Sequence, residues 1–318
     1  MPPPPPRQAI PGVAHIVAVS SGKGGVGKST VAGKRGGWWR SRSREFPPPP
    51  YFFSSTSSSS LFKKKKIAVN LAVALARSGL RASILDADVH GPSVPRLLGL
   101  AGRRAEVDPA SGKLVPLLCR GGLVRSLSMG NLVDEGAAAV WRGPMVMSAL
   151  ETLTRQADWR GTDVLVLDMP PGTGDAHLSV AQRLPLAGAL AVTTPQRVAV
   201  DDVRRGARGW SAAGVRLLGV VENMSGFACS GCGRVEDVFG GGGGGGEGED
   251  EGESEASRLL GAPLLARVPL SRALRVSCDE GRPLVLLSEE ERGLDRGARA
   301  SAEALERVAA RVREILGI

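Results

Sequence analysis

The stretch SSGKGGVGKST, residues 20–30, contains the strongest indication of the fold of this chain. It follows the apolar run HIVAV at residues 15–19, which predicts a buried strand. From Gly22 onward it has the pattern GxxxxGKS of a phosphate-binding loop, in which backbone N–H groups cradle phosphate oxygens. Lys28 would approach the β and γ phosphates, and the Ser29 hydroxyl would bind Mg²⁺. The residues expected to hold the nucleotide are Gly22, Gly24, Gly25, Val26, Gly27, Lys28, Ser29 and Thr30. A glycine-rich turn that matched by chance would not need to follow a strand and end in Lys-Ser-Thr.

Length and composition predict one large α/β domain. The chain has 318 residues, 42% of them hydrophobic, and we place the domain at residues 12–318 after a proline-rich start at 1–11. No apolar run approaches the roughly 20 residues that span a bilayer. Four cysteines in a chain of this length do not form a disulfide framework, which suits a reducing compartment.

The positive charge is concentrated in one segment. Residues 33–68 contain nine basic residues and one acidic residue, so they account for +8 of the net charge of +9. A basic groove for specific nucleic-acid binding is therefore not expected in the folded domain.

The same segment interrupts the helix that should follow the phosphate loop. That helix is expected to begin at Ser29, but residues 33–68 are rich in glycine, proline and serine and end in four lysines, and the helical pattern resumes at Ile67. Joining Ala32 to Val69 restores one continuous amphipathic helix. We interpret residues 33–68 as a low-complexity insertion, such as a retained intron, that puts nucleotide affinity in doubt. Residues 240–255 predict a second irregular stretch, a flexible glycine and acidic loop.

Strands that end in aspartate recur along the chain. Residues 81–85 lead into Asp86 and Asp88, and residues 164–167 lead into Asp168. Carboxylates at the carboxyl ends of parallel strands lie where open sheets bind ligands, and Asp168 suits the metal-binding acid of a P-loop enzyme. Further strands are expected at 189–193, 217–221 and 263–268, and helices at 145–156, 198–213 and 302–316. The alternation predicts a doubly wound, mostly parallel sheet of the P-loop NTPase type.

Cys229 and Cys232 form a single CxxC pair. Two thiolates cannot complete a four-coordinate metal site, and we expect Cys119 and Cys278 to be buried small residues. Two copies meeting on a two-fold axis would supply four sulfurs. An intramolecular redox pair and a zinc site with other ligands remain alternatives. The lone His177 is expected to be structural or to face solvent.

Lys23, directly after Gly22, makes the loop resemble the deviant loop of dimeric ATPases such as the Min and Par positioning proteins and the Mrp-type iron-sulfur carriers. The chain is most similar to the Mrp-type branch, and within it to the nucleotide-binding-protein-like (Ind-type) carriers. The stretches that carry this resemblance are SGKGGVGKST, ILDADVHGPSVP, SMGNLV, VWRGPMVMSAL, VLDMPPGTGDAHLS, TTPQ and GVVENMSGFACSGC.

The resemblance implies roles for particular residues. Lys23 would reach the phosphates bound by a second subunit, Asp86 and Asp88 would position the attacking water and the metal, and Asp168 would hold Mg²⁺. Asn223 would contact the adenine edge. Cys229 and Cys232 would bridge a 4Fe-4S cluster between two copies of the chain.

The resemblance also implies a function. We expect a homodimeric carrier that binds ATP, hydrolyses it slowly and delivers clusters to apo iron-sulfur proteins, in particular during assembly of respiratory complex I. By resemblance it would lie in the mitochondrial matrix; the alternative is the cytoplasm. The alternative functions are a Min/Par-like positioning ATPase and an isoform inactivated by residues 33–68.

Overall fold

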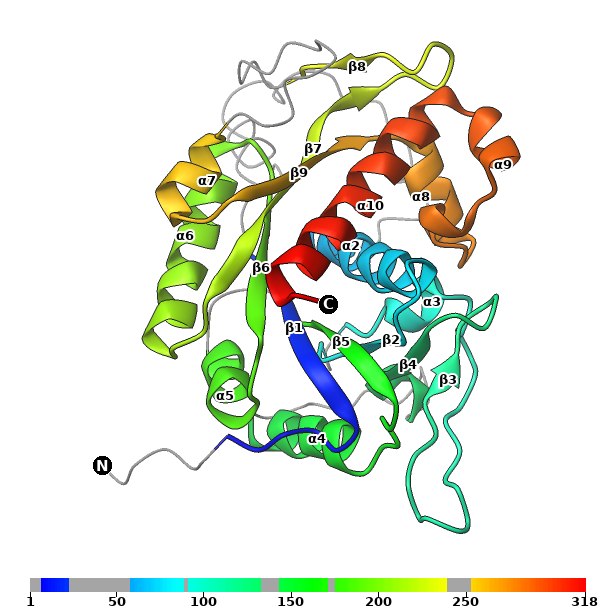
Figure 1. Ribbon diagram of the computed structural model, residues 1–318, viewed down its shortest axis with the longest axis vertical. Coiled ribbons are helices and arrows are strands. Elements are labelled where there is room, and N and C mark those ends of the chain that lie inside the picture. The colour runs from blue at the N-terminus through cyan, green and yellow to red at the C-terminus, as the bar shows by residue number, and fades with distance from the viewer. Residues whose placement is uncertain (1–6, 23–57, 89–90, 133–142, 171–174, 239–252) are drawn as a thin grey trace, which may run out of the picture.

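The computed structural model describes residues 7–22, 58–88, 91–132, 143–170, 175–238 and 253–318 (Figure 1). Within these residues nine strands form one sheet in the order β3-β4-β2-β5-β1-β6-β7-β8, with β9 also paired to β7. The strands are β1 (Val13–Ser21), β2 (Ala82–Asp86), β3 (Leu117–Leu118), β4 (Arg125–Ser128), β5 (Thr162–Asp168), β6 (Gly188–Thr193), β7 (Leu217–Ala228), β8 (Val235–Glu236) and β9 (Leu264–Leu270). Only the two-residue strands β3 and β8 pair antiparallel with their neighbours. The predicted doubly wound, mostly parallel sheet is confirmed.

Helices cover both faces of the sheet. They are α2 (Ser58–Arg77), α3 (Val94–Leu97), α4 (Gly143–Arg155), α5 (Asp175–Arg183), α6 (Arg197–Ala212), α7 (Glu255–Leu260), α8 (Arg272–Asp279), α9 (Glu289–Gly293) and α10 (Arg296–Leu316), with 3-10 turns at Met129–Asn131 and Leu284–Leu286. Alternate residues of β1 face opposite cores, because successive side chains of a strand point to opposite sides. Val17 and Val19 lie in the core under α2, α3, α8 and α10, whereas Ile16 and Ala18 lie in the core under α4, α5 and α6. The central strand is therefore buried from both sides.

Helix α2 begins earlier than the sequence predicts. The helical pattern was expected to resume at Ile67, but α2 begins at Ser58 and includes all four lysines of the run 63–66. Residues 58–66 contain neither glycine nor proline. Lysine is a good helix former, and extending an existing helix costs little compared with nucleating one. The lysine run therefore belongs to α2, and Lys64 and Lys65 are buried.

Helix α2 is held in the core by polar contacts as well as apolar ones. Every residue from position 67 to position 76 is buried. The side-chain carbonyl of Asn70 accepts a hydrogen bond from the Val285 N–H at 3.2 Å, and its amide donates to the Lys66 carbonyl at 2.8 Å. A buried amide that is satisfied in this way fixes the helix relative to the turn at residue 285.

Strand β7 is longer than the predicted strand at 217–221 and continues to Ala228. Met224 has a left-handed backbone with φ of 60°, and the pairing with β9 is irregular between Asn223 and Phe227. Beyond this bend β7 forms a hairpin with β8, visible at the top of Figure 1. The hairpin carries the two predicted metal-binding cysteines beyond the parallel part of the sheet.

None of the helices in the described part of the chain combines the length and the apolar character that crossing a bilayer requires.

Candidate functional site

The strand that leads into the phosphate loop is where the sequence predicts it. β1 ends at Ser21, and Gly22 follows against α6, where an added Cβ would lie 2.5 Å from the Cβ of Asp202. Such a distance is shorter than any van der Waals contact, so this position requires glycine. The rest of the predicted loop, residues 23–30 with Lys23, Lys28 and Ser29, lies outside the described residues. Its roles therefore stay predictions.

The structure brings the three predicted aspartates together. β2 and β5 are adjacent, and their register pairs Asp86 with Asp168 at the carboxyl ends of both strands. Asp86 and Asp168 are fully buried, and Asp88 is 1% exposed. We call Asp86, Asp88 and Asp168 the carboxylate cluster. It lies beside the end of β1, at the edge of the sheet where an open α/β fold binds its ligands.

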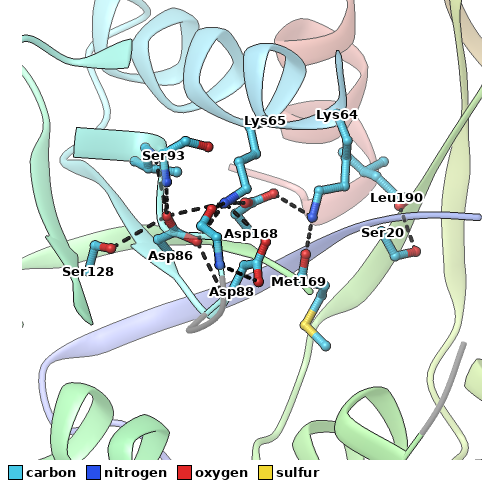
Figure 2. A network of polar contacts seen from close by, with 12 residues as sticks. Ser20, Lys64, Lys65, Asp86, Asp88, Ser93, Ser128, Asp168, Met169 and Leu190 are labelled. Atoms are coloured by element: carbon cyan, nitrogen blue, oxygen red, sulfur yellow. Dashed lines mark hydrogen bonds and ion pairs between the residues drawn. The ribbon is translucent and has the colours of Figure 1, made fainter. Parts of the chain in front are cut away.

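Two lysines that sequence analysis did not assign to the site enter the carboxylate cluster from α2 (Figure 2). Lys64 Nζ lies 2.7 Å from Asp168 Oδ1 and donates a hydrogen bond to the Met169 carbonyl. Lys65 Nζ lies 3.2 Å from Asp88 Oδ2, 3.4 Å from Asp86 Oδ1 and 3.8 Å from Asp168 Oδ2. Neither lysine side chain is exposed. Buried charges of opposite sign therefore face one another at this site.

A sequence signal for these lysines exists. When Ala68 of KKKKIA (63–68) is aligned with Ala32 of GKSTVA (27–32), Lys64 takes the register of Lys28 and Lys65 that of Ser29. The two stretches therefore align in sequence, and in the structure the second of them belongs to α2. Interpreting the lysine run as the end of an insertion hides this register.

Burial and charge act together on the ionisation of this site. Burial raises the pKa of Asp86 to about 6; the Lys65 ammonium opposes the increase, and Asp168 and Asp88 add to it. Burial also lowers the pKa of Lys65, but the combined attraction of the three carboxylates outweighs it, and the pKa lies above the ordinary lysine value. Lys65 therefore carries its charge inside the protein.

Hydrogen bonds hold Asp86 in place. Its Oδ2 accepts from the backbone N–H groups of Ser93 and Val94 at 3.1 and 3.2 Å, and its Oδ1 accepts from the Asp88 N–H at 3.1 Å. In contrast, Asp88 Oδ2 and both oxygens of Asp168 receive no hydrogen bond of good geometry within the described residues. Their charge is balanced through ion pairs with Lys64 and Lys65.

The carboxylate cluster, as arranged here, does not fit Mg²⁺. Its oxygens are the ligand type that Mg²⁺ prefers. However, the Lys65 ammonium occupies the space that the three carboxylates share (Figure 2). In the described part of the chain, no three acidic, histidine or cysteine side chains converge in a way that could hold a metal ion.

Asn223, predicted to contact adenine, lies in β7 opposite Val268 of β9 and is 6% exposed. It directly precedes the left-handed Met224. A non-glycine residue in this conformation stores strain, and strained positions concentrate at functional sites. Its contact with adenine stays a prediction.

The predicted cysteine pair lies on the tip of the β7–β8 hairpin. Cys229 is half-buried, Cys232 is exposed, and both are free thiols. The Cys229 N–H donates to the Arg234 carbonyl at 3.0 Å, and the Gly233 N–H donates to the Cys229 carbonyl at 2.8 Å, which closes the turn tightly. Hydrogen bonds from the backbone N–H groups of Cys232 and Gly231 lower the pKa of the Cys229 thiol. A thiolate that is accessible and already stabilised is suited to binding soft metals.

Cys119 and Cys278 are buried, as the sequence predicts. Burial raises the pKa of the Cys278 thiol. Neither residue completes a metal site with the hairpin cysteines in the described part of the structure.

His177 is buried. Of the two alternatives predicted for it, a structural role or a solvent-facing position, the structure supports the first. Its ring packs edge-on against Trp210 with centroids 5.3 Å apart, and the Trp210 N–H donates to Ser20 Oγ at 3.2 Å. Burial lowers the pKa of His177 to about 4, with a smaller contribution from the charge of Lys64. The imidazole is therefore neutral at pH 7.

A surface cavity of about 820 Å³ lies between α7, β9 and α10 and is lined by Arg258, Pro263, Leu264, Arg307 and Arg311 among others. Because Leu264 begins β9, the cavity opens at the amino edge of the parallel sheet, opposite the carboxylate cluster. We do not assign it to the nucleotide site.

A doubly wound parallel sheet, with a glycine-rich loop after its central strand and buried aspartates at the ends of the neighbouring strands, defines the class of P-loop NTPases. The family model described as the NUBPL iron-transfer P-loop NTPase, of the ParA type, matches residues 63–311. The chain belongs to this family.

Curated relatives support the assignment. The chain is 39% identical over 311 residues to an iron-sulfur cluster carrier protein of Synechocystis, an alignment covering 97% of this chain and 72% of the relative. It is 40% identical to the iron-sulfur protein required for NADH dehydrogenase, mitochondrial, of Arabidopsis thaliana, covering 87% of this chain and 73% of the relative. For the iron-sulfur cluster carrier protein of Helicobacter pylori, at 38% identity, the alignment covers 86% of this chain and 62% of the relative.

Solved structures share the fold. A nucleotide-binding protein of Archaeoglobus fulgidus in complex with ADP has a TM-score of 0.60 at 28% identity, covering 85% of this chain and 87% of that one. The cell division protein MinD of Aquifex aeolicus has a TM-score of 0.54 at 18% identity, covering 95% and 97%. At that identity the likeness to MinD concerns the fold alone.

Proposed function

We propose that this protein carries an iron-sulfur cluster and delivers it to apo iron-sulfur proteins. The observation that carries the proposal is the exposed hairpin with Cys229 and Cys232, whose thiols are free and one of which has a lowered pKa. Membership of an iron-transfer family and relatives named as cluster carriers support it. The cluster is cargo in this proposal, and the hairpin is its binding site.

The proposed carrier is a homodimer. Each chain offers two thiols on one turn, whereas a 4Fe-4S cluster takes four. Two hairpins related by a two-fold axis would supply all four sulfurs, and an exposed tip is the part of the structure that can meet its symmetry copy.

Anaerobic reconstitution with ferrous iron and sulfide tests this proposal. We expect a brown protein with about four irons per two chains and the mass of a dimer. Cys229→Ser and Cys232→Ser should each abolish the colour and the dimer, and Cys119→Ala, which removes a buried thiol, should retain both. A colourless monomer that binds one zinc ion would contradict the proposal.

The nucleotide part of the proposal rests on the P-loop family. ATP would bind at the loop with Lys28 and Ser29 on the phosphates and the metal, and Lys23 would act across the dimer. Slow hydrolysis of ATP at this loop would change how the hairpins meet. Loss of ATP binding in Lys28→Ala, measured by calorimetry, tests this part separately from the thiols.

A second candidate is a cluster carrier that no longer hydrolyses ATP. The specific observation in its favour is the pair of buried lysines in the carboxylate cluster. This candidate is a form of the predicted isoform inactivated by residues 33–68. It is supported against the hydrolysing carrier if the reconstituted protein holds a cluster but releases no phosphate from ATP.

The recipients and the compartment follow from the relatives by analogy. The Arabidopsis relative is named for mitochondrial NADH dehydrogenase, which favours subunits of respiratory complex I as recipients and the mitochondrial matrix as the location. The cytoplasm remains the alternative. Fractionation of cells expressing the tagged full-length protein tests the compartment.

A further inference from the structure

We propose that Lys65 is an internal cation that takes the place of a divalent metal in the carboxylate cluster, so that the chain excludes Mg²⁺ from this site while Lys65 lies there. The proposal concerns regulation of the nucleotide site. It does not depend on cluster binding at Cys229 and Cys232.

The position of the ammonium group is the first argument. Lys65 Nζ is within 3.8 Å of an oxygen from each of the three aspartates, and it also donates a hydrogen bond to the Gly91 carbonyl at 2.5 Å. All of these partners are oxygens, the ligand set of a hard cation. A lysine nitrogen surrounded in this way fills the space in which a metal ion would have to sit.

The charge balance is the second argument. Three carboxylates would be strongly repulsive in a buried site without compensation. The ammonium groups of Lys64 and Lys65 reduce the formal charge of the group from −3 to −1. Adding Mg²⁺ beside Lys65 would place two cations in contact, which Coulomb repulsion in a buried site strongly disfavours.

The register of α2 is the third argument. Lys65 aligns in sequence with Ser29, the residue predicted to bind Mg²⁺, when residues 63–68 are aligned with residues 27–32 on Ala68 and Ala32. The family match also begins at residue 63, at the start of the lysine run. In this alignment Lys65 places an ammonium group where Ser29 would place the hydroxyl that is predicted to bind the metal.

Lys66 provides a matched control, because it is the next residue on the same helix but lies outside the carboxylate cluster. Its side chain is 15% exposed and pairs at 3.7 Å with Asp279, which is 54% exposed. Replacing Lys66 removes the same charge from the same helix turn without changing the carboxylate cluster.

Mn²⁺ binding to the full chain, followed by electron paramagnetic resonance, tests the proposal. We expect wild type and Lys66→Ser to show only weak binding, and Lys65→Ser to bind one Mn²⁺ at least about tenfold more tightly because a repelling charge is removed. Adding Asp88→Asn to Lys65→Ser should reverse the gain. A folded Lys65→Ser chain that binds no more tightly than wild type would overturn the proposal, as would a wild-type Mn²⁺ site that Asp88→Asn abolishes.

A second measurement needs no variant. If Lys65→Ser does not fold, it tests whether Lys65 is held in the carboxylate cluster. The native wild-type chain is treated with an amine-acylating ester, and modification of each lysine is quantified by mass spectrometry. Because Lys65 is buried and ion-paired, it should react at least about tenfold more slowly than Lys66. Equal rates would show that Lys65 is not held in the carboxylate cluster. Cys229→Ser should leave both measurements unchanged, so failure here is distinguishable from failure of the cluster-carrier proposal.

Discussion

Lys64 and Asp168 form an ion pair in the interior of the protein, with Lys64 Nζ 2.7 Å from Asp168 Oδ1 and neither side chain exposed. The pair joins α2 to the carboxyl end of β5, since Lys64 also donates to the Met169 carbonyl. This turn of α2 is therefore fixed against the carboxylate cluster.

Lys64→Met should strongly destabilise the fold. The substitution keeps an unbranched side chain that is shorter by one atom but leaves Asp168 without its closest charge partner, and breaking a buried pair in this way costs about 3–5 kcal/mol. The free energy of unfolding from urea titration at pH 7 measures the effect. Lys66→Met should cost less than about 1 kcal/mol, because that side chain pairs with an exposed aspartate.

The double variant Lys64→Met/Asp168→Asn distinguishes a charge effect from a packing effect. It should recover part of the stability lost in Lys64→Met, since the uncompensated carboxylate is gone. Losses that simply add would show that the two residues are not energetically coupled.

Acidification should destabilise the protein through His177. Its pKa is about 4 in the folded state and about 6.5 when unfolded, so its contribution is present above pH 6.5 and is lost as pH falls from 6.5 towards 4. The shift corresponds to about 3 kcal/mol across that range. Urea titrations at several pH values should show a smaller loss for His177→Phe, which retains a ring against Trp210. Identical pH profiles for the two proteins would contradict this assignment.

The cysteines should differ in reactivity towards iodoacetamide. Cys229 has a lowered thiol pKa and partial exposure, whereas Cys278 is fully buried with a raised pKa. Because the thiolate is the reactive form, alkylation of native protein at pH 7 should be at least about 100-fold faster at Cys229. Mass spectrometry after timed quenching measures both rates in one sample. Comparable rates in the folded protein would place Cys278 in contact with solvent.

Gly281→Ala should be more damaging than Gly79→Ala. Both glycines have positive φ, of 70° and 95°, so both substitutions cost about 1 kcal/mol through backbone strain. An added Cβ at Gly281 would lie 2.6 Å from the Cα of Gly99, whereas at Gly79 nothing lies within 4 Å. We expect Gly281→Ala to cost about 2 kcal/mol more, as is usual for overpacking. Thermal unfolding of the two variants compares them, and equal losses would mean that the loop at Gly99 moves away freely.

Local patterns were sufficient to predict the framework of the site. The apolar runs before Gly22, Asp86 and Asp168 predict buried parallel strands, and side chains at the carboxyl ends of such strands necessarily share one edge of the sheet. The cysteine spacing likewise predicted a compact pair, since CxxC places both thiols on one turn. These features depend on residues close together in the chain.

The lysines could not be placed in this way. In sequence, residues 63–66 are interpreted as the end of a low-complexity insertion. Only the docking of α2 against β2 and β5 buries Lys64 and Lys65 while leaving Lys66 near the surface. His177 was equally ambiguous until its contact with Trp210 was known.

Strand periodicity and short-range spacing in the sequence are enough to predict the parallel sheet and the three aspartates at the carboxyl ends of its strands. Which cations neutralise Asp86, Asp88 and Asp168 becomes visible only in the folded chain. The energy of a buried charge depends on what surrounds it, and these surroundings come from segments far apart in the sequence.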